Sequence, residues 1–167
     1  CTSKQYDIDI TVATCNILSA NDYKQRGQGF AGKAGFLQEQ FKNEKLHIVG
    51  IQEAKSREVG TIPGEHYWRI IPEHGDAKNS DVELWVSRTL PFAVAGNSKI
   101  GIEKKDINII EAAHRIMLVA LRTAFIDLDI VVTHAPLSRG RSKIEKAHAI
   151  EHWKVVSKML ARRKSLH

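Results

Sequence analysis

Three polar residues come at the ends of segments that are predicted to form β-strands: Asn16, Glu53 and His134. Glu53 closes the run 46–53 (Leu-His-Ile-Val-Gly-Ile-Gln-Glu), whose continuous apolar core is typical of a strand buried on both faces. A carboxylate there must meet a cation, a hydrogen-bond donor or water, because burying it alone is costly. Carboxylates bind hard cations, neutral amides orient anions without repelling them, and imidazoles exchange protons near neutral pH. The three residue types therefore favour a metal-assisted site at the rim of a sheet.

The segments around these residues predict a mixed α and β protein. Residues 7–16 alternate and predict a half-buried strand, with Ile8, Ile10, Val12 and Thr14 on one face. A helix stripe with period 3.6 follows, made of Phe30, Ala34, Leu37 and Phe41. After the buried strand, two hairpins are expected: residues 67–71 with 82–86, and residues 116–124 with 128–133. Residues 93–102 predict only a weak strand and a turn.

A final helix is predicted from about residue 142 to 163. Its core-facing stripe is Ala149, Trp153, Val156 and Leu160, and the lysines at 143, 146, 154 and 158 lie opposite. We expect this helix and the earlier one to cover the same face of one sheet, which contains residues 48–51 and 130–132. A second sheet would cover the other face.

Composition indicates one domain over residues 1–167, with 43% apolar residues and 26% charged residues. No apolar run approaches the roughly 20 residues of a membrane span. The chain begins at Cys1 without Met, so we expect it to be cut from a longer protein or processed. Two cysteines are too few for a disulfide framework, which fits an intracellular setting, nuclear or cytoplasmic.

The formal net charge is +6, and the basic residues gather in the last part of the chain. After residue 138 there are nine Lys or Arg, at 139, 141, 143, 146, 154, 158, 162, 163 and 164, against Glu145 and Glu151. Such a segment either faces a polyanion or forms a solvated helix surface. If nucleic acid binds, we expect Arg139, Arg141 and Lys143 to contact it.

Three sequence pieces occur in a familiar order: Thr-Cys-Asn-Ile (14–17), Ile-Val-Gly-Ile-Gln-Glu (48–53) and Val-Val-Thr-His-Ala-Pro (131–136). Together with His-Arg-Ile-Met-Leu-Val-Ala-Leu (114–121), they resemble the endonuclease/exonuclease/phosphatase superfamily. The resemblance covers nearly the whole chain and is nearest to the endonucleases of LINE-type retrotransposons and to apurinic-site endonucleases.

The resemblance implies a four-layer α/β sandwich with the active site where the two sheets open. It implies that Glu53 binds Mg²⁺ (or Mn²⁺), that Asn16 contacts the scissile phosphate, and that His134 contacts the phosphate or protonates the leaving oxygen. The implied reaction is hydrolysis of a phosphodiester, with DNA as the expected partner. A phosphodiester is already an anion, so its attack needs a cation to neutralise the developing charge.

The chain departs from the family in its second half. The family also carries a Gly-Asp-x-Asn motif and a closing Ser/Thr-Asp-His motif, and residues 1–167 contain neither. The sequence therefore resembles the N-terminal part of such a domain, and a C-terminal half or a partner chain would complete the sandwich. Activity of this part alone is not expected.

Three other functions stay open from the sequence. A lipid or inositol phosphatase, or a sphingomyelinase, would belong to the same superfamily, and a non-catalytic remnant would bind nucleic acid or a partner. The segment His148-Ala-Ile-Glu-His152 also spells the motif of inverted zinc peptidases. We favour helix-edge histidines there, since both flank the predicted core stripe and no credible third ligand follows in the fifteen residues left.

Overall fold

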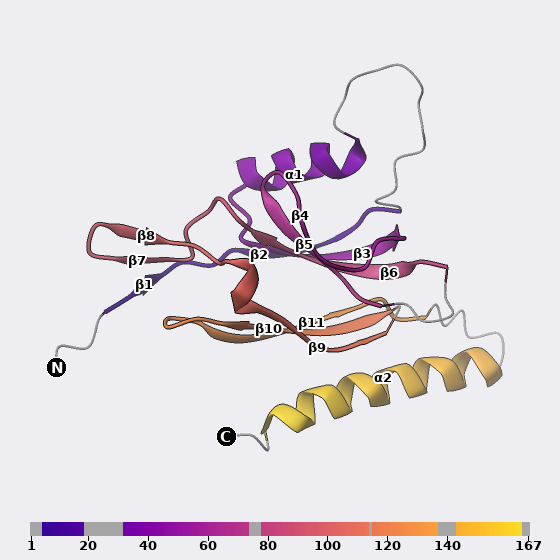
Figure 1. Cartoon of the computed structure of the whole chain (residues 1–167). Coiled ribbons are helices and arrows are strands. Elements are labelled where there is room, and N and C mark those ends of the chain that lie inside the picture. Colours follow the sequence, from indigo (N-terminus) through magenta and orange to yellow (C-terminus); the bar gives the residue numbers. More distant parts are fainter. Residues whose placement is uncertain (1–4, 19–31, 74–77, 114, 137–142, 165–167) are drawn as a thin grey trace.

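The computed structural model describes residues 5–18, 32–73, 78–113, 115–136 and 143–164 (Figure 1). This part of the chain forms a mixed α and β fold of three sheets and two α-helices, which confirms the predicted class. The largest sheet has the order β2 (Val12–Asn16), β3 (Ile48–Ser56), β6 (Ser80–Ser87), β5 (Tyr67–Ile71) and β4 (Gly60–Pro63). A three-stranded sheet contains β11 (Asp127–Thr133), β10 (Ile116–Arg122) and β9 (Ile107–Ala113). A small sheet contains β1 (Asp7–Ile8), β7 (Ala93–Ala95) and β8 (Ser98–Ile100), and a 3-10 turn spans Lys104–Asp106.

The five-stranded and three-stranded sheets pack face to face, and a helix lies on the outer face of each (Figure 1). The main core fills the space between the sheets, with Leu84 and Val86 of β6 packed in one cluster with Met117 and Val119 of β10. Helix α1 (Lys33–Asn43) covers the five-stranded sheet, and α2 (Lys143–Lys164) covers the three-stranded sheet. The observed order of layers is therefore helix, sheet, sheet, helix.

This arrangement corrects the expected packing. Residues 48–51 and 130–132 belong to two different sheets, and the helices lie on opposite outer faces instead of sharing one. Strand β10 shows why the packing was mispredicted. Every residue from 116 to 121 is buried. Alternate side chains of such a strand point to the inter-sheet core and to α2. A continuous apolar run predicts burial on both faces but does not identify which elements cover them.

The local predictions of strands and helices are largely confirmed. The hairpins β5–β6 and β10–β11 occur where expected, and residues 93–102 contain the short hairpin β7–β8. On α1, Ala34, Leu37 and Phe41 pack on the five-stranded sheet as predicted, while Phe30 lies outside the described residues. Strands β4 and β9 were not predicted.

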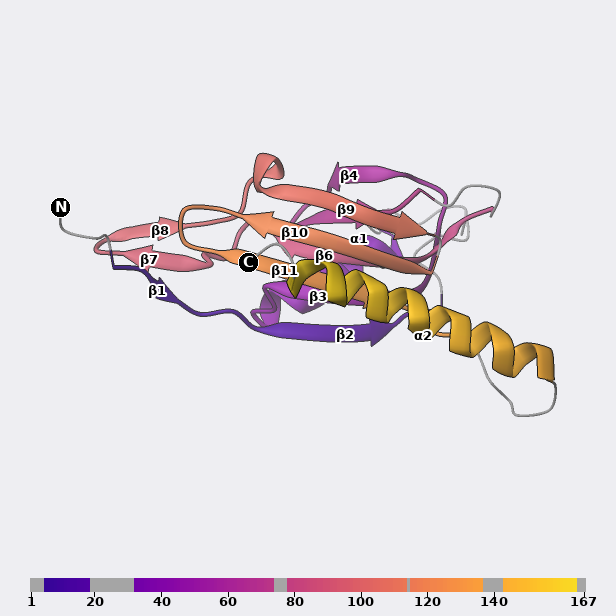
Figure 2. The same cartoon turned by 90° about the horizontal axis from the view of Figure 1, so that it is seen from below.

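The first segment differs from its prediction. Residues 7–16 form two short strands in different sheets, and in β2 the half-buried side chains are Ala13 and Cys15. Val12 pairs in parallel register with Ile48 and therefore faces the same side, yet Val12 is 61% exposed and Ile48 is 0% exposed. Val132 of β11 lies over Gly50 of β3, so the three-stranded sheet ends before it reaches β2. Figure 2 shows β2 extending past that edge.

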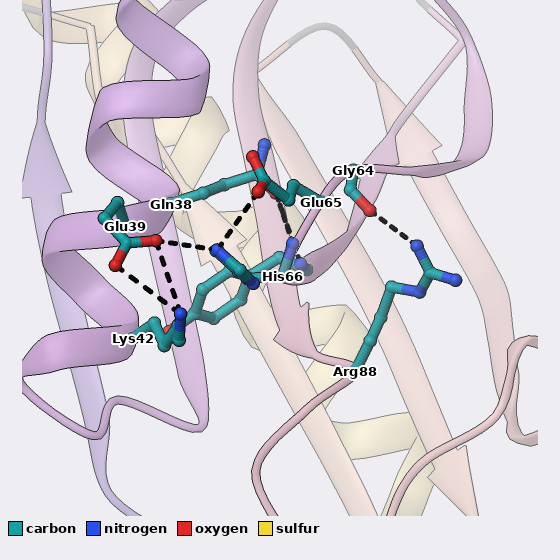
Figure 3. A network of polar contacts seen from close by, with 8 residues as sticks. Gln38, Glu39, Lys42, Gly64, Glu65, His66 and Arg88 are labelled. Atoms are coloured by element: carbon teal, nitrogen blue, oxygen red, sulfur yellow. Dashed lines mark hydrogen bonds and ion pairs between the residues drawn. The ribbon is translucent and has the colours of Figure 1, made fainter. Parts of the chain in front are cut away.

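Helix α1 is joined to the turn between β4 and β5 by polar contacts (Figure 3). The buried Gln38 accepts hydrogen bonds from the backbone N–H groups of His66 and Tyr67 at 3.0 and 3.2 Å. The His66 Nε2 atom lies 2.7 Å from Glu39 Oε2, and this hydrogen bond lowers the pKa of Glu39. A Cβ at Gly64 would lie 2.3 Å from Gln38 Oε1, so a larger residue there would force the Gln38 amide to shift. These contacts fix α1 on the sheet whose other end carries Asn16 and Glu53.

Candidate functional site

Asn16, Glu53 and His134 lie together at one end of the two packed sheets. Asn16 ends β2, Glu53 lies in the last part of β3, and His134 directly follows β11. The Asn16 Nδ2 group donates a hydrogen bond to Glu53 Oε1 at 2.7 Å, and His134 Nε2 lies 3.8 Å from the same oxygen. The structure thus brings together the three residues that the sequence singled out, although they come from three strands and two sheets.

Glu53 does not end its strand as predicted, because β3 continues to Ser56. Pairing of β3 with β6 is interrupted between Gln52 and Ser56, and Glu53 and Lys55 both have a φ of 54°. A left-handed backbone conformation at a residue with a side chain costs of order 1–3 kcal/mol. Such conformations gather at functional sites, where the surrounding structure holds them. This bulge brings the Glu53 carboxylate to Asn16 and His134.

The local contacts around Asn16 fix its side chain. Its Oδ1 atom accepts a hydrogen bond from the backbone N–H of Leu18 at 3.3 Å, while its amide nitrogen donates to Glu53. The backbone N–H of Ile17 donates to the Gln52 carbonyl at 3.2 Å and continues the pairing of β2 with β3. Both functional groups of the amide are therefore oriented before any ligand arrives.

The His134 ring lies between two carboxylates, those of Glu53 and Asp81. His134 Nδ1 is 3.6 Å from Asp81 Oδ2 and makes no hydrogen bond among the described residues. Arg115 Nε donates to the same Asp81 oxygen at 3.0 Å, and the Arg115 carbonyl accepts a hydrogen bond from the His134 backbone N–H at 2.9 Å. Arg115 therefore holds both the carboxylate and the backbone next to the imidazole.

Asp81 and Arg115 were missed by the sequence reasoning. Arg115 stands in the segment that supports the family resemblance, but the sequence alone gave it no role. The pairing that places Asp81 is that of β6 with β3, which run antiparallel, and the predicted hairpin of residues 67–71 and 82–86 does not indicate it. The first residues of β6 must then lie beside the last residues of β3, which places Asp81 near Glu53.

Helix α2 approaches the same end of the sheets through His152. His152 Nε2 lies 2.6 Å from Thr133 Oγ1, which is within hydrogen-bond distance. Burial lowers the pKa of His152, and the positive charges of Arg115 and His134 lower it further. His148, the other histidine of the zinc-peptidase motif, is exposed, so the described geometry favours helix-edge histidines.

Glu53 is the residue here that could hold a divalent metal. Within the described residues, no three His, Cys, Asp or Glu side chains are placed to hold a metal ion together. Mg²⁺ keeps several waters and is usually held by one or two carboxylates together with phosphate oxygens of the substrate. The Glu53 carboxylate, 28% exposed and beside a neutral amide, fits this type of site in its donor chemistry.

The predicted nucleic-acid contacts are described only in part. Arg139 and Arg141 fall outside the described residues, and Lys143 is exposed at the start of α2. None of the described helices is long and apolar enough to cross a membrane.

Comparisons with protein-family models, with curated proteins and with solved structures found no match to this chain.

Proposed function

We propose that this chain carries the N-terminal part of a Mg²⁺- or Mn²⁺-dependent phosphodiester hydrolase of the endonuclease/exonuclease/phosphatase type, acting on DNA as a retrotransposon-like or apurinic-site-like endonuclease. One observation carries the proposal: Asn16, Glu53 and His134, chosen from sequence, meet within hydrogen-bond or ion-pair distance. The order helix, sheet, sheet, helix is also what a four-layer sandwich of this type requires.

Each residue has a role that its contacts allow. Glu53 would hold the metal, which when bound would neutralise the negative charge that develops on the phosphate. Asn16 would orient the phosphate without repelling it, because its amide is neutral and already fixed by Leu18. His134 would give or take a proton, and Asp81 and Arg115 would hold the imidazole in position.

DNA as the substrate is supported by charge. The net charge of +6 and the basic residues after position 138 suit a polyanion more than a small phosphoester. Lys143, exposed at the start of α2, belongs to this basic part, and α2 reaches the site through His152.

A second part of the sandwich would add beside β2 and β11. Both strands are edges in the described sheets, and the inward-facing Val12 of β2 is largely uncovered. A C-terminal half or a partner chain that adds strands there would cover Val12 and could bring the Gly-Asp-x-Asn and Ser-Asp-His motifs to the site. We therefore expect residues 1–167 alone to bind metal without efficient turnover.

The test is nicking of supercoiled plasmid DNA with Mg²⁺ by the chain extended through the coding sequence downstream of His167. We expect chelator-sensitive nicking that Glu53→Gln abolishes, since the isosteric amide keeps the shape but loses the charge. Glu73→Gln changes an exposed carboxylate outside the site and serves as the matched control. Nicking that survives Glu53→Gln would remove Glu53 from the site. Hydrolysis of inositol phosphates or sphingomyelin without nicking would instead assign the lipid or inositol phosphatase alternative.

A further inference from the structure

The outer side of α2 presents large apolar side chains that the fold does not use. The predicted core stripe was Ala149, Trp153, Val156 and Leu160, but Trp153 and Leu160 are 50% and 54% exposed. The helix instead packs on the sheet through Val155, Val156 and Met159. Helix α2 thus has two apolar stripes, one that packs on the sheet and one that is exposed. Both lie close to Val156, so the sequence pattern alone did not show which stripe packs on the sheet.

The exposed stripe has the spacing of a helix-packing seam. Ile150, Trp153, Ser157 and Leu160 follow one another at i, i+3, i+7 and i+10, which is the a/d spacing of a coiled coil. Ile150 is 57% exposed, and a shallow groove open to solvent is lined by Ile150, Trp153, Lys154, Ser157 and Lys158. A helix lying along α2 would insert its side chains into such a seam.

The charges beside the seam select the partner. Lys154 and Lys158 are exposed beside the seam, and the exposed Lys146 continues its line one turn before Ile150, while Glu151 is 3.5 Å from Lys154. A second copy of α2 would bring lysines against lysines, which opposes self-association. Nucleic acid would match the charge but would leave Ile150 and Leu160 without a role. An acidic helix with an apolar stripe satisfies both features.

We propose that the seam Ile150–Trp153–Ser157–Leu160 of α2 is a docking surface for an amphipathic helix of a partner protein with Asp or Glu along its flanks. This inference does not depend on the proposed nuclease activity, because the seam lies on the exposed side of α2 and not on the side that packs on the three-stranded sheet. The apolar side chains supply the burial, and the lysines set partner choice and orientation.

The test uses a synthetic helical peptide of about three heptads, with Leu at a and d and Glu at e and g. Titration into the full chain should shift the Trp153 indole N–H signal in NMR spectra, and raised salt should weaken binding. Ile150→Ser combined with Leu160→Ser should weaken binding about tenfold or more. The control is Ile144→Ser, because Ile144 is 69% exposed on α2 but outside the seam. A peptide with Lys in place of Glu should not bind.

Several results would overturn the proposal. Equal binding of the acidic and basic peptides, or equal loss with the control variant, would show that the seam does not select an acidic helix. If the peptide does not bind, two other results would reassign the seam, provided that the double variant removes them. Binding to phosphatidylserine vesicles would assign it to a membrane, and self-association in ultracentrifugation would assign it to a second copy of the chain. The substituted side chains are exposed, and circular dichroism would check that the variants keep the fold.

Discussion

The side chains at the candidate site are held by one another before any ligand binds. Asn16 orients Glu53, and Asp81 lies between Arg115 and the His134 ring. The sequence singled out Asn16, Glu53 and His134 but not Asp81 and Arg115, because a residue that acts through a neighbour has no motif of its own. Only the antiparallel pairing of β6 with β3 places Asp81 beside Glu53.

At the residue scale, His152 predicts how the stability of the chain depends on pH. Its pKa is lowered from 6.5 in the folded chain, so the unfolded chain binds more protons as the pH falls through 6.5. The stability associated with neutral His152 is therefore complete above pH 6.5 and is lost as the pH falls toward the folded pKa. We expect the urea midpoint to fall between about pH 7.5 and 5.5, and to fall less in His152→Gln. An identical fall in both proteins would exclude His152 as the cause.

At the scale of elements, a buried ion pair joins the neighbouring strands β5 and β6 of the five-stranded sheet. Glu83 of β6 is 0% exposed and accepts hydrogen bonds from Arg69 of β5 at 2.9 and 3.1 Å and from Trp85 Nε1 at 2.5 Å. Burial acts to lower the pKa of Arg69, but the hydrogen bonds and charges of Glu83 and Glu58 outweigh it and raise the pKa. The pair therefore holds two adjacent strands beneath α1.

We predict that Glu83→Gln lowers the free energy of unfolding by about 3–5 kcal/mol, because it leaves Arg69 buried without its main counter-charge. Adding Arg69→Met to Glu83→Gln should restore part of the loss. Urea unfolding of the two single variants and the double variant measures this coupling. Additive losses would mean that the two residues stabilise the sheet independently.

Local sequence patterns predicted the positions of strands and helices far better than they predicted which elements pack together. The hairpins β5–β6 and β10–β11 were predictable because apolar runs and intervening polar turns are short-range signals. The sheet to which a strand belongs depends on distant segments, so residues 48–51 and 130–132 were wrongly placed in one sheet. The same limit applies to α2, where Trp153 and Val156 are both apolar but only Val156 is buried.

At the scale of the whole molecule, the two sheets enclose a core but do not match in width. Val12 and Ile48 are register partners on one face, and only Ile48 is covered by the second sheet. We predict that Ile48→Ala lowers the free energy of unfolding by about 2–5 kcal/mol, whereas Val12→Ala changes it by less than about 0.5 kcal/mol. Urea unfolding of both variants tests this difference. A large loss for Val12→Ala would show that another segment covers β2 in solution.

The basic part of the chain predicts salt-dependent binding to DNA. Neutralising Arg139, Arg141 and Lys143 together should reduce the slope of log K against log salt by up to about 3, since each phosphate contact contributes roughly 0.9. The loss should be similar for all sequences, because phosphate contacts carry no base information. Fluorescence anisotropy over a range of salt measures the slope, and an unchanged slope would place the contacts elsewhere.

Metal binding at Glu53 tests the central claim most directly. Small amounts of Mn²⁺ added to residues 1–167 should broaden the NMR amide signals around Asn16, Glu53 and His134, which lie together. The same titration of Glu53→Gln should leave these signals sharp, and Glu73→Gln should behave like the unchanged chain. Broadening that persists in Glu53→Gln, or that centres on His148 and Glu151 of α2, would contradict a metal site at the ends of β2, β3 and β11.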